Sequence, residues 1–392
     1  MSKEEANSKS NDLSDRETVK AGLQAVMELA KSKLQIDGSI GEIGMALKYF
    51  LDAVNKNKSY QDIKVSALEE NMFDGAKGAT ASSLTAAVET VQHAELASLE
   101  KYLHLAHLAY EKDTEDLRSK LKDYGYELQT HYFNVNPGEV GHYVALDHEN
   151  KTLLIGARGT SSVADVLTDL LAVSTTHVCS PRCPFTGSED GTTEIVGHNG
   201  ILATALHLLD QIYETVEEFA LQGGYKIRIC GHSLGAGVAS LLGILLRTRP
   251  GEQLRDPDNL QVYAVASPAV LDLQSSRKAA SFITSFANKS DVVPRISSGN
   301  IEVMAKVLEN VILTMRTDLH EGKACDRTPF AVMKTHKMID DAAKTEFDVE
   351  KVDKIHGHMM ACLSAVDVES RDHLFMPGRV ILFYDKTKNI DP

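Results

Sequence analysis

The sequence lacks the charge pattern that marks proteins bound to nucleic acids or held at anionic surfaces. Among its 392 residues, 41 are Lys or Arg and 55 are Asp or Glu, so the formal net charge is −14. An acidic chain without a basic block is a poor match for nucleic acid, because contacts with phosphates dominate that affinity. Charge alone would not hold such a chain at an anionic membrane either. We therefore expect no nucleic-acid partner.

Cysteines and long apolar runs are also scarce. Five cysteines, an odd number, do not resemble the disulfide framework of a small secreted domain. Residues 1–15 are polar and charged, without the apolar region that a secretory signal peptide needs. The longest apolar stretch, residues 234–246, is too short to cross a bilayer as a helix. These absences predict a reduced, soluble, cytoplasmic protein that is at most peripheral to membranes, with no signal peptide and no transmembrane helix.

The length, composition and periodicity of the chain predict a large domain with extensions. The apolar fraction of 43% and the charged fraction of 24% are typical of a globular chain. Residues 1–98 show helical periodicity after about thirteen polar residues expected to be disordered, and we interpret them as an N-terminal helical extension. Residues 99–392 then form the second domain, interrupted at about 297–375 by a charged helical insert. That insert is either a lid or regulatory cap, or an ordinary surface elaboration.

Segments typical of strands and helices alternate beyond residue 124. Strands are expected at 132–135, 142–146, 152–157, 225–230, 260–266, 282–287 and 379–384, with helices at 162–172, 199–221 and 234–248. Alternation at this spacing is typical of an α/β fold, in which helices cover both faces of a mainly parallel sheet.

One motif carries recognisable chemistry. Gly231-His232-Ser233-Leu234-Gly235 fits the G-x-S-x-G pattern and stands between an expected strand and an apolar helix, which is the context that a nucleophile elbow requires. The glycines permit a sharp turn that presents the Ser233 hydroxyl, and the Leu234 N–H at the helix start would face a developing oxyanion. The alternative is a glycine-rich turn with a structural role only. We interpret the motif as a nucleophile elbow.

A serine nucleophile needs a base that is oriented by an acid. Asp291 follows the strand expected at 282–287, so it would lie at the carboxyl edge of the sheet, where such an acid is found; the alternative is an aspartate in a surface turn. A second oxyanion donor is expected after the strand at 152–157, where Thr160 offers both its N–H and its hydroxyl.

Several segments, in this order, resemble the class 3 (fungal-type) lipases, and among them the sn-1-specific diacylglycerol lipases. They are Arg158-Gly159-Thr160, Asp165 with Asp169-Leu170, His198-Asn199-Gly200, the Ser233 motif through Gly237, and Asn288 to Arg295. The resemblance covers roughly residues 99–295 and 376–380. It implies an α/β-hydrolase fold, with Ser233 as nucleophile, Asp291 as acid, and Thr160 and Leu234 as the oxyanion hole. It also implies a lipase that cleaves an acylglycerol ester, such as that of diacylglycerol, through an acyl-enzyme and without a cofactor.

The catalytic histidine is where the sequence departs from that family. The family places it after the last strand, yet residues 385–392 contain no histidine. We assign His373, just before that strand, as the nearest candidate. Other candidates lie in the insert: His320, His336, His356 and His358. A third possibility is that no base is in place. The chain would then be a truncated or catalytically impaired lipase-like protein, serving as a lipid-binding or scaffold module.

A zinc site is the weaker hypothesis for the segment 173–197. Cys179 and Cys183 have a spacing that metal ligands use, with His177 and His198 nearby in the sequence. One short pair with distant histidines is a weak signal, so a flexible loop with two free thiols is expected, and neither metal nor other cofactor. The expected partner is an acylglycerol or other acyl-lipid substrate, which leaves room for transient contact with a membrane or lipid-droplet surface.

Overall fold

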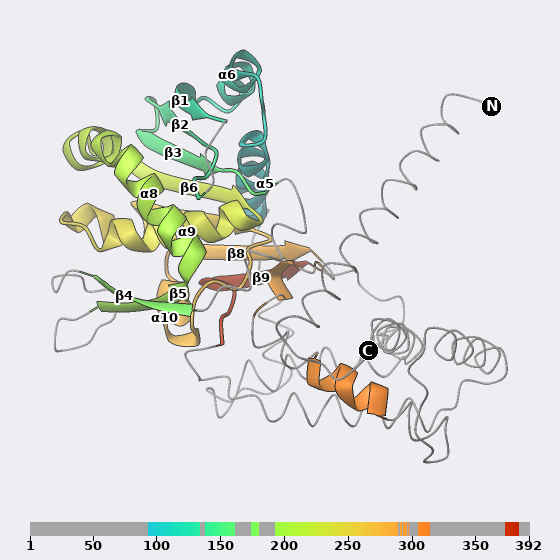
Figure 1. Cartoon of the computed structure of the whole chain (residues 1–392). Helices are drawn as coiled ribbons and strands as arrows, with labels where there is room; N and C mark the ends of the chain where they lie inside the picture. The colour runs from blue at the N-terminus through green and yellow to red at the C-terminus, as the bar shows by residue number, and fades with distance from the viewer. Residues whose placement is uncertain are drawn as a thin grey trace, which may run out of the picture. The chain divides into compact units, whose positions relative to one another are not determined.

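The chain divides into two compact units, residues 1–91 with 301–366 and residues 92–300 with 367–392. The computed structural model describes residues 93–133, 138–160, 174–179, 193–288, 291, 293–295, 297, 305–313 and 373–383. The first unit is thus described only over 305–313, which is helical. Every element named below belongs to the second unit (Figure 1).

A seven-stranded sheet, in the order β1-β2-β3-β6-β7-β8-β9, forms the centre of the second unit (Figure 1). Its strands are β1 (Glu127–Tyr132), β2 (His142–Asp147), β3 (Thr152–Ala157), β6 (Lys226–His232), β7 (Leu260–Val265), β8 (Ile283–Asn288) and β9 (Arg379–Phe383). The pairs β1–β2 and β2–β3 are antiparallel, and every pair from β3 to β9 is parallel. The predicted mainly parallel sheet of an α/β-hydrolase is therefore confirmed.

Helices cover both faces of this sheet. The helix α5 (His93–Leu108) packs on the face that carries Cys230 and Tyr263, whereas α9 (Leu234–Arg247) packs on Ile229 and Val262. Consecutive residues of a strand point to opposite faces, so these two helices lie on opposite sides of β6 and β7. The remaining helical segments are α6 (Thr114–Asp123), α8 (Asn199–Thr215) with a π-helical continuation at Val216–Gln222, and α10 (Leu273–Ala279).

The helix α9 can be apolar on every side because the rest of the unit encloses it. All but two of its residues are buried between the sheet and α8. A helix without a polar face is stable in water only when it is covered in this way. The apolar stretch at 234–246, too short for a bilayer, is therefore a core helix. Among the described residues, none of the helices combines the length and apolarity that crossing a membrane requires.

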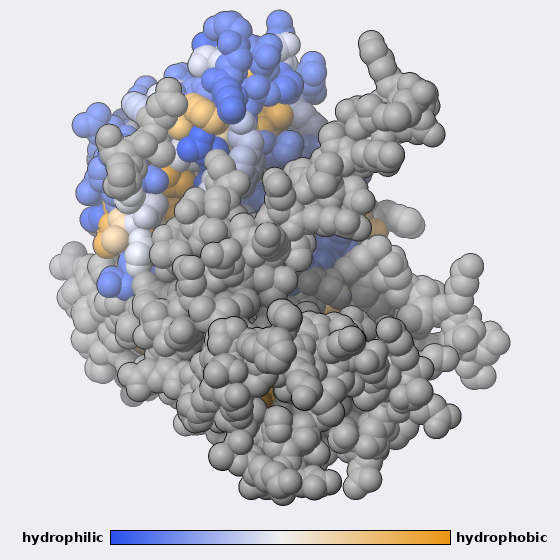
Figure 2. All heavy atoms as spheres, turned by 45° about the vertical axis from the view of Figure 1, so that its right-hand side comes forward, coloured by the Kyte–Doolittle hydropathy of each residue, from blue (hydrophilic) through white to orange (hydrophobic). Residues whose placement is uncertain are grey.

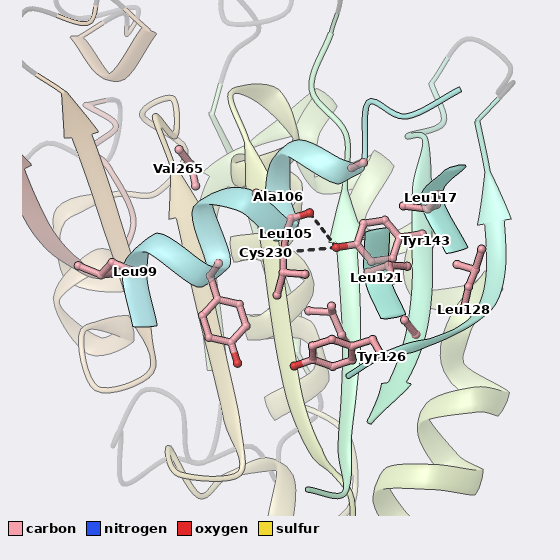
Figure 3. Packing of buried hydrophobic residues seen from close by; sticks show 14 of the residues in the cluster. Leu99, Leu105, Ala106, Leu117, Leu121, Tyr126, Leu128, Tyr143, Cys230 and Val265 are labelled. Carbon is pink, nitrogen blue, oxygen red and sulfur yellow. Dashed lines mark hydrogen bonds between the residues drawn. The ribbon is translucent and has the colours of Figure 1, made fainter. Parts of the chain in front are cut away.

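The core on the α5 side is built around Tyr143, whose side chain is fully buried (Figure 3). Its hydroxyl donates a hydrogen bond to the Leu105 carbonyl at 2.8 Å and lies 4.0 Å from the Cys230 sulfur. Burial raises the pKa of the Cys230 thiol to about 12, so this cysteine is an inert packing residue. On the described surface seen in Figure 2, hydrophilic residues predominate and apolar ones form small areas.

Two expectations about this unit are wrong. The first strand was expected at 132–135, but it runs from Glu127 to Tyr132, because its antiparallel pairing with β2 places Tyr132 opposite His142. The segment 173–197 was expected to be a loop, but it contains β4 (Ser174–Cys179) and β5 (Thr193–His198), which pair as an antiparallel two-stranded sheet.

The boundary at residues 98/99, between the N-terminal extension and the second domain, stays a prediction, since residues 1–92 lie outside the described part of the chain. The helix α5 begins at His93 and shares a compact unit with the sheet. The insert predicted at about 297–375 is described only at 297, 305–313 and 373–375. The helix expected at 162–172 likewise lies outside the described residues.

Candidate active site

The turn between β6 and α9 holds Ser233 in a strained conformation. Its backbone angles are φ 57° and ψ −129°, and the residue is only 7% exposed. Positive φ is uncommon for a residue with a side chain, and it persists where the surrounding structure imposes it. Here the Ser233 N–H donates a hydrogen bond to the Val265 carbonyl at 2.9 Å, which ties the turn to β7. This is the strand–turn–helix geometry that the motif predicts.

The glycine at 235 is required by a close approach of two backbones. A Cβ atom added there would lie 2.4 Å from the Ala157 carbonyl oxygen and 2.6 Å from the Arg158 carbonyl carbon. No side chain fits such distances, so the first turn of α9 can rest directly on the end of β3. The motif's other glycine, Gly231, meets the backbone of Gly235 in the same way, at 2.3 Å.

The loop after β3 lies against the Ser233 turn. A Cβ atom added at Gly159 would lie 2.5 Å from the His232 carbonyl oxygen and 3.1 Å from the Ser233 Cβ. Thr160 therefore follows a residue in direct contact with the turn. Leu234 is the first residue of α9, and the first N–H groups of a helix have no acceptor within the helix. The two predicted oxyanion donors thus come from loops that touch each other.

His232, next to the serine, connects this turn to its surroundings. Its Nδ1 lies 3.0 Å from the Tyr110 hydroxyl. Burial lowers the pKa of the His232 imidazole, while the negative charge of Asp291 acts against that shift. The charge of Asp291 thus favours the protonated form of the imidazole beside Ser233. Sequence reasoning missed both His232 and Tyr110, because the motif leaves the residue before the serine open and no motif includes Tyr110.

Asp291 lies at the carboxyl edge of the sheet, as predicted. It comes three residues after β8, and its N–H donates a hydrogen bond to the Asn288 carbonyl at 3.0 Å. One carboxylate oxygen accepts a hydrogen bond from the Val293 N–H at 3.1 Å. These contacts hold the side chain in a turn beyond the strand end. The structure thus brings Ser233, Leu234, Thr160 and Asp291 to the same edge.

His373 lies in the segment that leads into β9. Phe375 forms an isolated bridge with Leu271, and a Cβ atom added at Gly378 would lie 2.3 Å from the carbonyl oxygen of Ile283, the first residue of β8. Because β8 and β9 are parallel, this segment enters the sheet at the edge opposite Ser233. No hydrogen bond joins His373 to Ser233, both of which are described. The role of His373 as base stays a prediction.

Several other candidates are only partly described. The insert histidines His320, His336, His356 and His358 lie outside the described residues, as do Asp165, Asp169 and Cys183. The ring of His198 is buried, and its Nδ1 accepts a hydrogen bond from the Ile201 N–H at 3.4 Å, which caps α8. Within the part of the chain that the structure describes, no three potential ligands gather as a metal site.

Residues 154–300, which run from β3 past Asp291, match the family described as Lipase (class 3). The resemblance to the class 3 lipases is confirmed. The lipase-like segment contains Thr160, Ser233, Leu234 and Asp291, and thus all of the predicted site except His373.

Two groups of relatives match part of this chain. Diacylglycerol lipase-beta of Mus musculus is 31% identical over 178 residues, which are 44% of this chain and 24% of that protein. Diacylglycerol lipase-alpha of Homo sapiens is 31% identical over 183 residues, 44% of this chain and 16% of that protein. Secreted mono- and diacylglycerol lipase A of Penicillium camembertii is 28% identical over 161 residues, 39% of this chain and 46% of that protein. The match spans less than half of each relative.

Among solved structures, the chain is similar to the lipase from Rhizopus microsporus var. chinensis. The identity is 22% and the TM-score 0.43, over 53% of this chain and 70% of that one.

Proposed function

We propose that this chain is a lipase-type serine hydrolase that cleaves an acylglycerol ester, such as that of diacylglycerol, through an acyl-enzyme on Ser233. The observation that carries the proposal is the Ser233 turn itself. A serine is held at positive φ between a parallel strand and a helix, in contact with a glycine loop from the neighbouring strand. The substrate class is supported by the relatives, which are named for mono- and diacylglycerols.

The proposed reaction proceeds in two steps. The Ser233 hydroxyl oxygen attacks the ester carbonyl carbon and gives up its proton to a base. The carbon–oxygen bond to the glycerol then breaks, and the leaving alcohol takes that proton. Water repeats the sequence on the acyl-serine and releases the fatty acid. The N–H groups of Thr160 and Leu234 would stabilise the oxyanion in both steps, and losing one such donor costs about 10²–10³ in turnover.

The proton acceptor in this proposal is a histidine oriented by Asp291. A carboxylate beside the imidazole fixes its tautomer and stabilises its protonated form. Asp291 has the required place at the carboxyl edge and a fixed side chain. His373 stays the base assigned from the sequence, although its segment enters the sheet at the edge opposite Ser233, and the insert histidines His320, His336, His356 and His358 stay the alternatives. Transient contact with a membrane or lipid-droplet surface belongs to the same proposal, because long-chain acylglycerols collect in such phases.

The test compares wild type with Ser233→Ala and with a matched control, Ser240→Ala. Ser240 is a buried serine of α9 whose hydroxyl bonds the Ala236 carbonyl at 2.8 Å, on the helix that follows the turn. Wild type and Ser240→Ala should bind a fluorophosphonate probe covalently and release fatty acid from diacylglycerol, and Ser233→Ala should do neither. Unchanged hydrolysis by purified Ser233→Ala would refute the assignment. A wild type that binds diacylglycerol without labelling or turnover would favour the lipid-binding alternative.

A further inference from the structure

The hydroxyl of Tyr110 lies between the two loops that supply the proposed oxyanion donors. Tyr110 follows the end of α5 at Leu108, and its ring is half-buried. Its hydroxyl oxygen lies 3.0 Å from His232 Nδ1, and a Cβ atom added at Gly159 would lie 2.3 Å from the same oxygen. One oxygen atom therefore contacts both the loop after β3 and the turn after β6.

The direction of this hydrogen-bond chain follows from the protonation of its members. Burial raises the pKa of Tyr110, so the phenol keeps its proton. Burial lowers the pKa of His232, so its imidazole is neutral and can accept. With the phenol protonated and the imidazole neutral, the Tyr110 hydroxyl donates its proton to His232 Nδ1 across 3.0 Å. The imidazole proton then lies on Nε2, and Tyr110 joins the His232 turn to the loop that it contacts at Gly159.

The charged groups around this chain leave its direction unchanged. Asp291 favours the protonated form of His232, whereas His107 and burial oppose it, and burial is the largest of these effects. Arg158 favours the ionised form of Tyr110, but burial again outweighs it. The Arg158 guanidinium is itself held over the Phe133 ring, at 4.2 Å from the ring centroid.

We propose that Tyr110 is a positioning residue for the oxyanion hole. It holds the Gly159-Thr160 loop at a fixed distance from the Ser233 turn, so that the Thr160 and Leu234 N–H groups converge on one point. This inference rests on the proposed function. Errors of about 1 Å in the placement of a catalytic group can cost about 10²-fold in rate. The hydroxyl of Tyr110 is a side-chain group that bridges the two loops, so removing it should loosen their separation.

The substitution Tyr110→Phe removes the hydroxyl and keeps the ring. The ring packs edge-on to His232 with centroids 5.8 Å apart and lies 5.9 Å from the ring of His107, and Phe retains both contacts. A matched control is Tyr263→Phe, on β7. Tyr263 is also half-buried, and its hydroxyl donates to the Gln261 side chain at 3.1 Å. The two variants lose the same atom, one beside the Ser233 turn and one within a strand.

The experiment measures diacylglycerol hydrolysis and fluorophosphonate labelling of the full chain in wild type and both variants. Tyr110→Phe should lower kcat and the labelling rate by about 10- to 10²-fold with KM changed less than about 2-fold, because the oxyanion forms only after binding. Tyr263→Phe should match wild type. In ¹⁵N spectra of histidine-labelled protein, the wild-type His232 Nδ1 should carry no proton, and Tyr110→Phe should lose this preference.

The outcomes separate the inference from the function on which it rests. If wild type is active and Tyr110→Phe has the same kcat, the positioning role is wrong. A proton on Nδ1 of wild-type His232 would overturn the hydrogen-bond chain whatever the activity. A wild type that is neither labelled nor active would instead overturn the proposed function, and the positioning role with it.

Discussion

A pair of glycine substitutions offers a sharp test of how the active-site turn is built. Gly235 is the second residue of α9 and Gly200 the second residue of α8. Replacing either by Ala adds one methyl group at the same position of a helix. At Gly200 the nearest atoms to the new Cβ would be those of the His198 ring, at 3.8 and 3.9 Å, an ordinary contact. At Gly235 they would be backbone atoms of Ala157 and Arg158, the nearest at 2.4 Å.

The expected magnitudes follow from these distances. Real Cβ atoms do not approach other atoms closer than 3.0 Å, so Gly235→Ala must push the end of β3 and α9 apart by about 0.6 Å, the difference between 3.0 and 2.4 Å. Overpacking of this kind costs about 1–3 kcal/mol, and better helix propensity returns up to about 1 kcal/mol. We expect a net loss of about 1–2 kcal/mol for Gly235→Ala and a gain of about 0.4–1 kcal/mol for Gly200→Ala.

Thermal unfolding and probe labelling check both consequences. A change of 1 kcal/mol shifts the Tm of a domain of 150–250 residues by about 2–4 °C. Gly235→Ala should therefore lower Tm by about 2–8 °C, and Gly200→Ala should raise it slightly. The displaced backbone leads directly into Gly159 and Thr160, so fluorophosphonate labelling of Gly235→Ala should also slow by about 10-fold or more. If the two variants unfold and label alike, the close contact between β3 and α9 is not what the glycine serves.

Two further predictions concern charge. Asp291→Asn should lower kcat by two orders of magnitude or more, because the acid sets the imidazole tautomer. The control Asp210→Asn, on the exposed side of α8, should have no effect. Equal rates in wild type and both variants would remove Asp291 from the mechanism. Burial lowers the pKa of His142 and His232 below the usual 6.5, so the folded chain binds fewer protons than the unfolded chain below that pH. The free energy of unfolding in urea should be level between about pH 6.5 and 8 and fall at lower pH; a level profile down to pH 5 would contradict the burial of these rings.

The sequence predicted those elements whose pattern lies in consecutive residues. The strand β6, the Ser233 turn and α9 follow one another directly. Their sequence combines β-branched residues, a serine with a glycine two residues away on each side, and an apolar run. The strands β2 and β3 were also predicted within a residue or two, because both are buried along their whole length and read as apolar runs.

Edge strands and outer elements were harder to predict. The strand β1 has the sequence ELQTHY and is mostly exposed or half-buried, so it lacks an apolar pattern. The strands β4 and β5 pair with each other in a separate two-stranded sheet, and the sequence of β4, STTHVC, is typical of a polar loop. Neither α6 nor α10 was predicted, and both are short. Their stability comes from pairing and packing partners that no short window of sequence contains.

The sequence by itself determined the local parts of the candidate site: a serine in a strand–turn–helix motif, with an aspartate after a later strand and a glycine loop after an earlier one. Only the tertiary structure decided that Gly159 touches the Ser233 turn, that Tyr110 contacts both, and that β9 lies beside β8 although the two strands are far apart in the chain. The reason is physical. The conformation of a turn depends on its own residues, whereas the distance between two loops depends on the register of the strands that carry them.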